Sequence, residues 1–458
     1  MRLLGFTACL AMLARSAAAI ELVIGNEDSV KAAASTIAFG LVKYYTGNNT
    51  GDTPGNLPDP YFWWEAGAMF GTLIDYWALS GDDSYNAITI QAITHQGTEN
   101  GDFMPRNQTR TLGNDDQGFW GMAAMSAAEN NFPNPPADQP QWLALAQSLF
   151  NQWASRWEDA TCGGGLRWQI FTFNNGFNYK NSISNGCFFN IAARLARYTG
   201  NETYAEWATK IFTWQETVGL ISPDHHVRDG VHINIADGTC NSMDQNEWSY
   251  NTGIFLHGAA VMYNHTNGSS IWRTRVDGML DGARSTFFDP EANNIMFEQL
   301  CEPSGFCNND QRSFKGYLTR WMAGTTQMAP YTFDAIHPLL VADAAAAAKA
   351  CVGSPAPPAF KGHAGTACGF RWTTGTFDGS TGVGEQMNAL SAVMYTLVGK
   401  VAAPVTADTG GTSKGNPNAK AHEEIGEKPI TIGDRVAAGF VTSAIGLGVV
   451  AGCAFVIS

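Results

Sequence analysis

Two adjacent carboxylates are the side chains best placed to do chemistry. Asp115 and Asp116 stand in the segment GNDDQGFWG (residues 113–121), directly before an apolar run. A pair of carboxyl groups can cleave a glycosidic bond when one acts as nucleophile or base and the other donates a proton. Successive side chains inside a helix diverge by about 100°, but at a helix start both can face one cavity. The motif therefore fits a glycoside-cleaving pair at the start of a buried helix.

The start of a helix could also hold the two groups in different protonation states. A carboxylate that accepts backbone N–H bonds at a helix N-terminus stays ionised. A second carboxyl group that is more desolvated and lies beside a like charge keeps its proton. Asp is also a common capping residue, so Asp115 and Asp116 could simply cap the helix, and the spacing leaves both interpretations open.

Other polar motifs offer less chemistry. Asp82 and Asp83 lie in the turn SGDDSY, where capping of the next helix explains them. His225 and His226 lie in a polar loop that supplies no third metal ligand at a typical spacing, and the chain has no CxxC or HExxH motif. A Ser-His-Asp mechanism has no GxSxG elbow to support it. We therefore expect neither a metal site nor a cofactor.

An internal repeat predicts the helices that position the acidic pair. Three segments begin with a Gly near a helix start, at Gly67, Gly186 and Gly253, and continue with residues that are apolar or small on almost every side. A helix that is apolar all round is a buried helix. Weaker copies of the start raise the number of expected buried helices to six. They are expected to begin near Glu65, Asp116, Asn185, Asn251, Phe314 and Glu385.

Amphipathic segments with helical spacing separate the buried helices. They span Val30–Tyr45, Ser84–His95, Gln141–Trp157, Thr203–Thr217, Ile271–Phe287 and Phe333–Ala350. Inner and outer helices in alternation predict an all-α fold, an (α/α)6 barrel of six helical hairpins. Strand signals are weak, and short hairpin strands are expected at Leu166–Thr172 and Val231–Ile235.

This fold brings the starts of all inner helices to one end of the barrel. The residues just before each repeat Gly would then line one cavity, and their aromatic, carboxylate, amide and basic side chains suit a sugar. Substrate contacts are expected from Trp64, Glu65, Asn114, Trp120, Asp229, Trp248, Tyr250 and Lys315. Core packing is the alternative for each aromatic residue, and Asp229 could instead stabilise its loop.

Both ends of the chain are predicted to be processed. Residues 1–19 combine a basic start, a short apolar run and terminal small residues, which is typical of a secretory signal peptide. Residues 402–432 are predicted to form a polar linker and residues 433–458 an apolar tail. This order is typical of a glycosylphosphatidylinositol (GPI) attachment signal, with a retained transmembrane helix as the alternative. The folded domain is expected at residues 20–401.

The cysteines fit an oxidising compartment. Removal of both ends leaves seven cysteines, most of which should pair outside the cytosol. The predicted pairs are Cys301–Cys307, Cys351–Cys368 and Cys162–Cys240. Cys187 then stays free, which suits its place in the apolar pattern of a helix.

The composition narrows the choice of partner. Charged residues make up 15% of the chain, below the roughly 25% of typical soluble domains. The formal net charge of −14 argues against nucleic acid and against anionic membrane surfaces, because phosphate binding needs a basic face. Low charge together with 14 Trp and 49 Gly suits a secreted protein with an uncharged ligand such as carbohydrate.

Four segments of the chain resemble a known family. They are YFWWEAGAMFGTLIDYWALSGD (61–82), GNDDQGFWGMAAMSAAE (113–129), ISNGCFFNIAARLARYTGN (183–201) and EWSYNTGIFLHGAAVMY (247–263). They resemble family 76 of the glycoside hydrolases, and more closely its fungal mannan endo-1,6-α-mannosidases, which are GPI-anchored cell-wall proteins. The resemblance covers about residues 20–401. It implies an (α/α)6 barrel and a retaining mechanism with Asp115 as nucleophile and Asp116 as general acid/base.

The resemblance leaves the donor and the acceptor open. Bacterial relatives cleave α-1,6-linked mannan, whereas the anchored fungal branch is thought to act on the mannose core of GPI glycans and to transfer wall proteins onto β-glucan. Hydrolysis and transfer share a glycosyl-enzyme intermediate. We expect a secreted monomer at the outer face of the plasma membrane and in the cell wall. A non-catalytic mannan-binding wall protein is the alternative, which the presence of both Asp115 and Asp116 disfavours.

Overall fold

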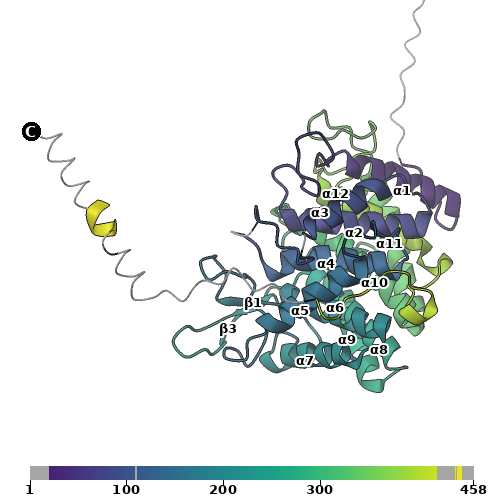
Figure 1. The fold of residues 1–458 in the computed structure, drawn as a ribbon. Helices are drawn as coiled ribbons and strands as arrows, with labels where there is room; N and C mark the ends of the chain where they lie inside the picture. The colour runs from purple at the N-terminus through teal and green to yellow at the C-terminus, as the bar shows by residue number, and fades with distance from the viewer. Residues whose placement is uncertain (1–19, 99, 109–110, 420–438, 440, 446–458) are drawn as a thin grey trace, which may run out of the picture. The chain divides into compact units, whose positions relative to one another are not determined.

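The computed structural model describes residues 20–98, 100–108, 111–419, 439 and 441–445. Within them, α-helices alternate between an inner and an outer position (Figure 1). The inner helices are α2 (Trp63–Ser80), α4 (Asn114–Glu129), α6 (Ser182–Thr199), α8 (Ser249–His265), α10 (Phe314–Met328) and α12 (Val383–Met394). The outer helices are α1 (Glu27–Val42), α3 (Asn86–Gln96), α5 (Trp142–Arg156), α7 (Glu202–Val218), α9 (Ser270–Phe287) and α11 (Phe333–Ala350). The predicted (α/α)6 barrel is confirmed.

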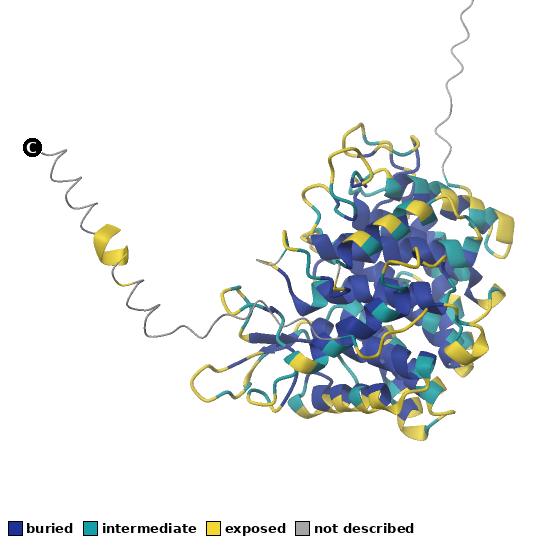
Figure 2. Ribbon diagram, viewed as in Figure 1, coloured by how far each residue is buried: buried dark blue, intermediate teal, exposed yellow. Residues whose placement is uncertain are grey.

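The inner helices form a closed ring. Each packs against the next along the chain, and α12 returns to pack against α2. The inner helices are buried on nearly every side, whereas the outer helices keep an exposed stripe (Figure 2). The low content of charged residues follows from this arrangement, because a helix without a solvated face has no place for charge.

The repeat glycines let the inner helices approach closely at the end where they begin, called the mouth below. A Cβ on Gly118 of α4 would lie 2.5 Å from the Cys187 sulfur on α6. A Cβ on Gly316 of α10 would lie 2.7 Å from the amide oxygen of Asn388 on α12, which instead accepts a hydrogen bond from the Gly316 N–H (2.7 Å). Neither position has room for a side chain. The repeat in the sequence is therefore a packing signal.

A small antiparallel sheet forms one wall of the mouth. Strand β2 (Gly230–His232) pairs with β1 (Tyr179–Asn181) on one side and with β3 (Ser242–Asp244) on the other. A separate two-stranded ribbon pairs β4 (Phe288–Asp289) with β5 (Ile295–Met296).

One of the two strands expected from the sequence forms in part, and the other does not form. The segment Val231–Ile235 contributes its first residues to β2, but the expected strand at Leu166–Thr172 is wrong. Its backbone bonds go to two separate segments: the Trp168 N–H donates to the Tyr179 carbonyl (2.7 Å) and the Ile170 N–H to the Leu112 carbonyl (3.4 Å). The segment bridges two loops and does not extend one strand, so a period-two pattern does not develop into a ladder.

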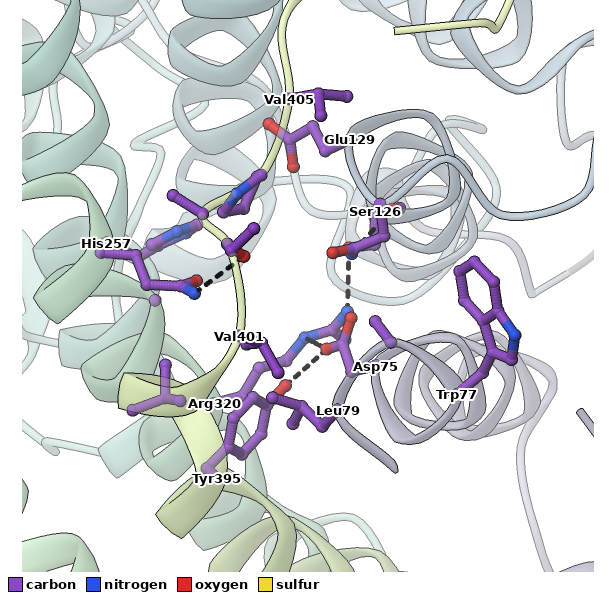
Figure 3. A pocket seen from close by; sticks show the side chains of 18 of the residues that line it. Asp75, Trp77, Leu79, Ser126, Glu129, His257, Arg320, Tyr395, Val401 and Val405 are labelled. Atoms are coloured by element: carbon purple, nitrogen blue, oxygen red, sulfur yellow. Dashed lines mark hydrogen bonds and ion pairs between the residues drawn. The ribbon is translucent and has the colours of Figure 1, made fainter. Parts of the chain in front are cut away.

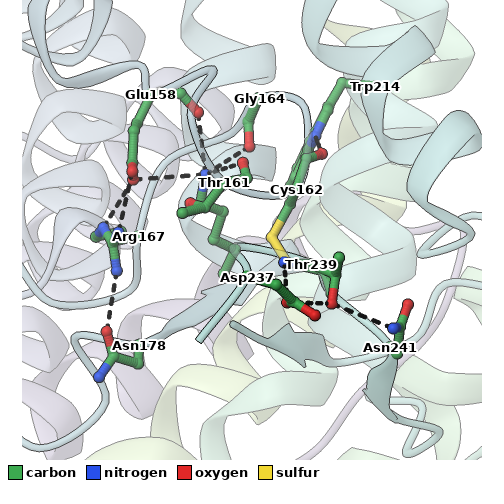
Figure 4. Close-up of a disulfide and its surroundings, with 12 residues drawn as sticks. Glu158, Thr161, Cys162, Gly164, Arg167, Asn178, Trp214, Asp237, Thr239 and Asn241 are labelled. Carbon is green, nitrogen blue, oxygen red and sulfur yellow. Dashed lines mark hydrogen bonds and ion pairs between the residues drawn. A yellow bond between two sulfur atoms is a disulfide. The ribbon is translucent and has the colours of Figure 1, made fainter. Parts of the chain in front are cut away.

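Disulfides fasten the loops at the mouth. Cys162–Cys240 joins the loop before α6 to the segment between β2 and β3 (Figure 4), Cys301–Cys307 closes a short loop before α10, and Cys351–Cys368 ties the end of α11 to the loop before α12. Cys187 is buried and unpaired in the described chain. The predicted pairings are confirmed.

The chain after α12 stays on the barrel. The Val405 N–H donates to the carbonyl of Glu129 at the end of α4 (2.8 Å), and the Ser413 hydroxyl accepts from the N–H of Leu143 in α5 (2.9 Å). Residues 402–419, called the strap below, are therefore part of the folded unit, although the sequence predicted a linker from residue 402. No helix among the described residues has the length and apolar character needed to cross a bilayer. The predicted signal peptide (1–19), the rest of the linker and most of the tail lie outside the described residues.

Candidate active site

A cavity of about 470 Å³ opens at the mouth. Aromatic rings and carboxylates dominate its walls, and none of the lining residues that the structure describes is basic. The lining residues are Phe62, Trp63, Trp64, Gln108, Thr111, Leu112, Asp115, Asp116, Phe119, Trp168, Gln169, Tyr179, Asn181, Asp229, Tyr250, Asp310 and Phe314. An acidic cavity of this kind suits a neutral or cationic sugar and would repel an anionic ligand.

The adjacent carboxylates lie in the first turn of α4 and both face the cavity. One oxygen of Asp116 accepts the N–H of Gly113, the residue before the helix, at 2.6 Å. One oxygen of Asp115 accepts the Asp116 N–H (3.1 Å), and the other lies 3.4 Å from the amide nitrogen of Asn181. The two interpretations left open by the sequence therefore coexist, because Asp116 caps the helix start and still lines the cavity.

The surroundings separate the protonation states of the pair. Burial raises the pKa of Asp115 to about 7, while hydrogen bonds from backbone N–H groups, Asn181 and Trp168 oppose that rise. Burial, and then the adjacent charge of Asp115, raise the pKa of Asp116 well above the usual value of an Asp. A single proton shared by the pair therefore resides on Asp116 and leaves Asp115 ionised.

Gly113 provides the space that this arrangement needs. A Cβ at Gly113 would collide with a carboxylate oxygen of Asp115 and would lie 3.1 Å from one of Asp116. It would also lie 3.2 Å from the carbonyl of Trp168, which accepts the Asn114 N–H (2.9 Å). The missing side chain lets both carboxylates fold back over the helix start.

A third carboxylate, Asp229, lies on the sheet wall of the cavity. It accepts hydrogen bonds from the Tyr179 hydroxyl (2.7 Å) and from the Asn251 amide (3.3 Å), and burial raises its pKa. Buried Lys180 holds the wall from behind, because its ammonium donates to the backbone carbonyls of Glu158, Thr161 and Gly164 near the Cys162–Cys240 disulfide. The sheet therefore presents Asp229 at a fixed position.

A fourth carboxylate, Asp310, was not singled out from the sequence. Burial raises its pKa to about 6, while a hydrogen bond from the Trp64 indole opposes that rise. Asp310 precedes Gly316 by six residues, whereas Asp115 precedes Gly118 by three, so the repeat does not align them. The available signal was its place in a loop that feeds an inner helix. Tyr179 and Asn181 were also missed, because they lie on a strand that the hydrophobic pattern did not predict.

Comparisons with known proteins show the family of the chain. The sequence model described as Glycosyl hydrolase family 76 matches residues 29–408. The chain belongs to this family.

Its relatives include proteins from several fungi. It is 46% identical over 438 residues to mannan endo-1,6-alpha-mannosidase DCW1 of Saccharomyces cerevisiae, a match that covers 94% of each chain. A putative mannan endo-1,6-alpha-mannosidase of Schizosaccharomyces pombe is 47% identical over 88% of each chain. The crystal structure of Dfg5 from Chaetomium thermophilum in complex with glucosamine superposes with a TM-score of 0.80 at 47% identity, covering 87% of this chain and 97% of that one.

Five of the ten predicted site residues line the cavity among the residues that the structure describes. They are Trp64, Asp115, Asp116, Asp229 and Tyr250. The other five, which lie outside the lining, are Glu65, Asn114, Trp120, Trp248 and Lys315. Proximity to the repeat Gly is a poor guide because successive helical residues point in different directions.

The residues outside the lining have packing roles. The Trp120 indole donates to the Trp63 carbonyl (3.2 Å) and fills the space over Gly67, so it belongs to the core. Buried Lys315 pairs with Glu302 (3.0 Å) behind the cavity wall. These positions favour the core-packing alternative for Trp120 and a structural ion pair for Lys315.

The remaining three residues, Asn114, Trp248 and Glu65, support the cavity wall from behind or are buried away from the cavity. The Asn114 amide donates to the Arg167 carbonyl (2.8 Å) and accepts from Arg156 (3.0 Å), which orients the start of α4 from behind. Trp248 packs edge-on against Phe314, with ring centroids 5.8 Å apart. Glu65 is fully buried and its carboxylate oxygens have no hydrogen-bond partner in the described chain, so burial raises its pKa well above the usual range.

A second cavity, of about 380 Å³, lies at the opposite end of the barrel, where the inner helices end (Figure 3). Its carboxylates are paired: Asp75 lies 2.7 Å from Arg320, and Glu129 lies 2.6 Å from Arg194. Val401 and the first four residues of the strap, 402–405, form part of its lining. Each of these carboxylates has an arginine as a direct partner, whereas the carboxylates of the mouth have none among the described lining residues.

Proposed function

We propose that the chain is a retaining α-mannosidase or transglycosidase that acts on α-1,6-linked mannan or on the mannose core of GPI glycans. The observation that carries the proposal is the carboxylate pair at the start of α4, which faces the cavity. The adjacent charge of Asp115 adds to the rise that burial causes in the pKa of Asp116, so Asp116 is the member of the pair that keeps its proton. Retaining glycosidases need one ionised nucleophile and one protonated acid beside it.

The reaction proceeds in two balanced steps. The Asp115 carboxylate attacks the anomeric carbon while Asp116 protonates the departing glycosidic oxygen, which gives a glycosyl-enzyme and a free leaving group. The Asp116 carboxylate then takes the proton of an incoming hydroxyl, whose oxygen attacks the same carbon and releases Asp115. Water as the incoming group gives hydrolysis, and a sugar hydroxyl of β-glucan gives transfer.

The walls of the cavity support an uncharged or basic sugar as substrate. Tyr250 stacks on Phe314 with ring centroids 3.8 Å apart, and Trp64 lies 4.6 Å from Phe119, so apolar faces flank the pair. Asp229 and the amide of Asn181 offer polar contacts to sugar hydroxyls. The names of the fungal relatives support mannan as donor, and the relative crystallised with glucosamine supports a glycan that contains an amino sugar.

The proposed setting is the fungal cell surface. The signal sequence, the tail typical of GPI attachment and the disulfides support secretion and anchoring at the outer face of the plasma membrane, with release into the cell wall. We propose a monomer, because the cavity is built from one chain.

The test is incubation with an α-1,6-mannotriose or a GPI-core glycan, each with and without a β-glucan oligosaccharide, with products followed by mass spectrometry and NMR. The proposal predicts cleavage with retained anomeric configuration, and a product heavier than the acceptor if transfer dominates. A folded protein that binds these glycans but cleaves neither would support the non-catalytic wall protein instead. An inverted product would contradict the assignment of Asp115.

A further inference from the structure

The loops around the mouth carry large apolar side chains that no part of the described chain covers. Phe306 is 84% exposed, Phe62 59% and Leu300 39%, and Phe173 is 63% exposed on a separate loop. Phe62, Leu300 and Phe306, called the rim patch below, belong to neighbouring loops, because the Asn309 amide before α10 donates to the Pro60 carbonyl before α2 (3.4 Å). Exposed apolar clusters of this kind mark interaction surfaces.

The loop that presents Phe306 is rigid. The Cys301–Cys307 disulfide closes it, the Phe306 N–H donates to the Cys301 carbonyl (3.2 Å), and the Ser304 hydroxyl donates to the same carbonyl (3.1 Å). Residues 303–306 at its tip are exposed and uncharged. A preorganised apolar tip loses little conformational entropy when a surface covers it.

The strap shows in which direction the chain leaves the barrel. The Ser413 hydroxyl accepts the N–H of Leu143, and the Asn416 N–H donates to the side-chain oxygen of Gln147 (2.6 Å). At the last described residue of the strap, the Ala419 carbonyl accepts from the Asn151 amide (2.8 Å). The three α5 residues lie four positions apart and therefore on successive turns of the helix. The strap therefore runs along α5 toward the C-terminal end of that helix.

That end of α5 lies at the mouth. Arg156, the last residue of α5, donates to Asn114 at the start of α4 (3.0 Å). The chain that follows in sequence carries the apolar run at residues 436–457. The last residue described before this run, Ala419, therefore lies along α5 on the way to the mouth, and not at the second cavity.

We propose that the mouth faces a membrane and rests on uncharged lipid headgroups through the rim patch and Phe173. The inference rests on the proposed function only in taking the tail as membrane-bound. Aromatic and aliphatic side chains partition into the interfacial region of a bilayer, and the net charge of −14 favours an uncharged surface over an anionic one. A saccharide surface is less suitable, because the aliphatic Leu300 offers no ring to stack on a sugar. This orientation brings the carboxylate pair to glycans that lie next to the bilayer.

The experiment places an environment-sensitive fluorophore on single cysteines in the full chain, bound to phosphatidylcholine vesicles that contain a lipid-attached quencher. The labelled positions are Phe306→Cys and Phe173→Cys at the mouth, and Ile271→Cys as a matched control. Ile271 is 64% exposed at the start of α9, at the opposite end of the barrel. Cys9 and Cys453 are replaced by Ser in every labelled variant, and buried Cys187 does not compete for the label.

The proposal predicts a blue shift and loss of fluorescence at positions 306 and 173 but not at 271. Equal quenching at 271 and 306 would overturn it, and so would a label at 306 that responds to a soluble β-glucan oligosaccharide but not to lipid. Cleavage of a soluble α-1,6-mannoside is measured on the same samples. Activity without quenching overturns the orientation alone, and quenching without activity overturns the proposed function alone.

Discussion

Each end of the barrel holds a cavity with buried carboxylates, but the two ends give those carboxylates different partners. At the far end Asp75 and Glu129 lie within 2.7 Å of arginines. At the mouth no described lining residue is cationic, and the pKa values of Asp115 and Asp116 are raised. The ion pairs at the far end serve the fold, whereas unpaired carboxyl groups with raised pKa values are typical of catalytic sites.

The raised pKa values at the mouth imply a cost in stability. A carboxyl group whose pKa is higher in the folded than in the unfolded chain contributes stability that is fully present below the unfolded pKa. That contribution is lost as the pH rises through the folded pKa. Asp116, whose pKa in the fold is raised well above the usual value of an Asp, therefore loses this contribution as the pH rises from the unfolded pKa through the raised one. The burial that makes the carboxyl pair reactive thus costs stability.

Removal of either carboxylate at the mouth should have the largest effect. Asp116→Asn removes the proton donor and should lower kcat by about 10²–10⁴-fold, and Asp115→Asn should abolish the covalent step. The far-end control is Asp75→Asn, which should leave kcat per folded molecule unchanged. Initial rates on an α-1,6-mannoside, corrected for the folded fraction, check this contrast. A wild-type rate in either mouth variant would end the assignment.

The same change from carboxylate to amide should shift stability in opposite directions at the two ends. Glu129→Gln leaves Arg194 buried without its counter-charge and should cost about 3–5 kcal/mol in the free energy of unfolding. Asp116→Asn relieves a carboxyl group that must stay protonated in the fold, so unfolding at pH 7 should require more free energy. Urea denaturation of both variants measures the difference. A loss of stability in Asp116→Asn at pH 7 would show that the pair is structural.

A side chain added at Gly113, directly before α4, should lower the catalytic rate, whereas one added at Gly81, directly after α2, should not. Gly113→Ala places a Cβ against Asp115 and Asp116, and a displacement of about 1 Å can cost about 10²-fold in rate. Gly81, at the end of α2, has no neighbouring atom within 4 Å of its Cβ position but a φ of +79°. Gly81→Ala should therefore cost about 1–2 kcal/mol of stability and leave the rate unchanged. Equal rates in the two variants would contradict the role given to Gly113.

The smallest expected effect is a shift in the pH profile. The acid limb of kcat/KM follows the protonation of Asp115, whose pKa is raised to about 7, and the alkaline limb follows loss of the proton from Asp116. Asn181→Ala removes a hydrogen bond to the charged form of Asp115 and should move the acid limb upward by about half to one pH unit. An acid limb that moves downward in this variant would exclude Asp115 as the ionised partner.

The fold could be predicted from the sequence because its signal is repeated. Every inner helix must be apolar all round and must carry a Gly near its start, so the pattern that begins at Gly67 recurs at Gly186 and Gly253. The disulfide Cys301–Cys307 was predictable for a simpler reason, since the two cysteines lie only six positions apart in the sequence.

The site was harder to predict because it depends on which way single side chains point. Trp64 faces the cavity and Glu65, the next residue, is sealed in the core, although both lie at the start of α2. Asp229 and Asp310 reach the cavity from loops whose paths depend on disulfides and on a short sheet. The polar composition of the strap predicts a linker, because it does not reveal that Ser413 and Asn416 form hydrogen bonds with α5.

The most direct measurement of the central claim is capture of the covalent intermediate. A fluorinated mannosyl donor with a good leaving group should form the glycosyl-enzyme quickly and release it slowly, so that proteolysis and mass spectrometry can locate the sugar. The account predicts one added fluoromannosyl unit on the peptide that contains residues 113–121, attached to Asp115, and no adduct in Asp115→Asn. A sugar attached to Asp116 or Asp229, or turnover without any adduct, would contradict it.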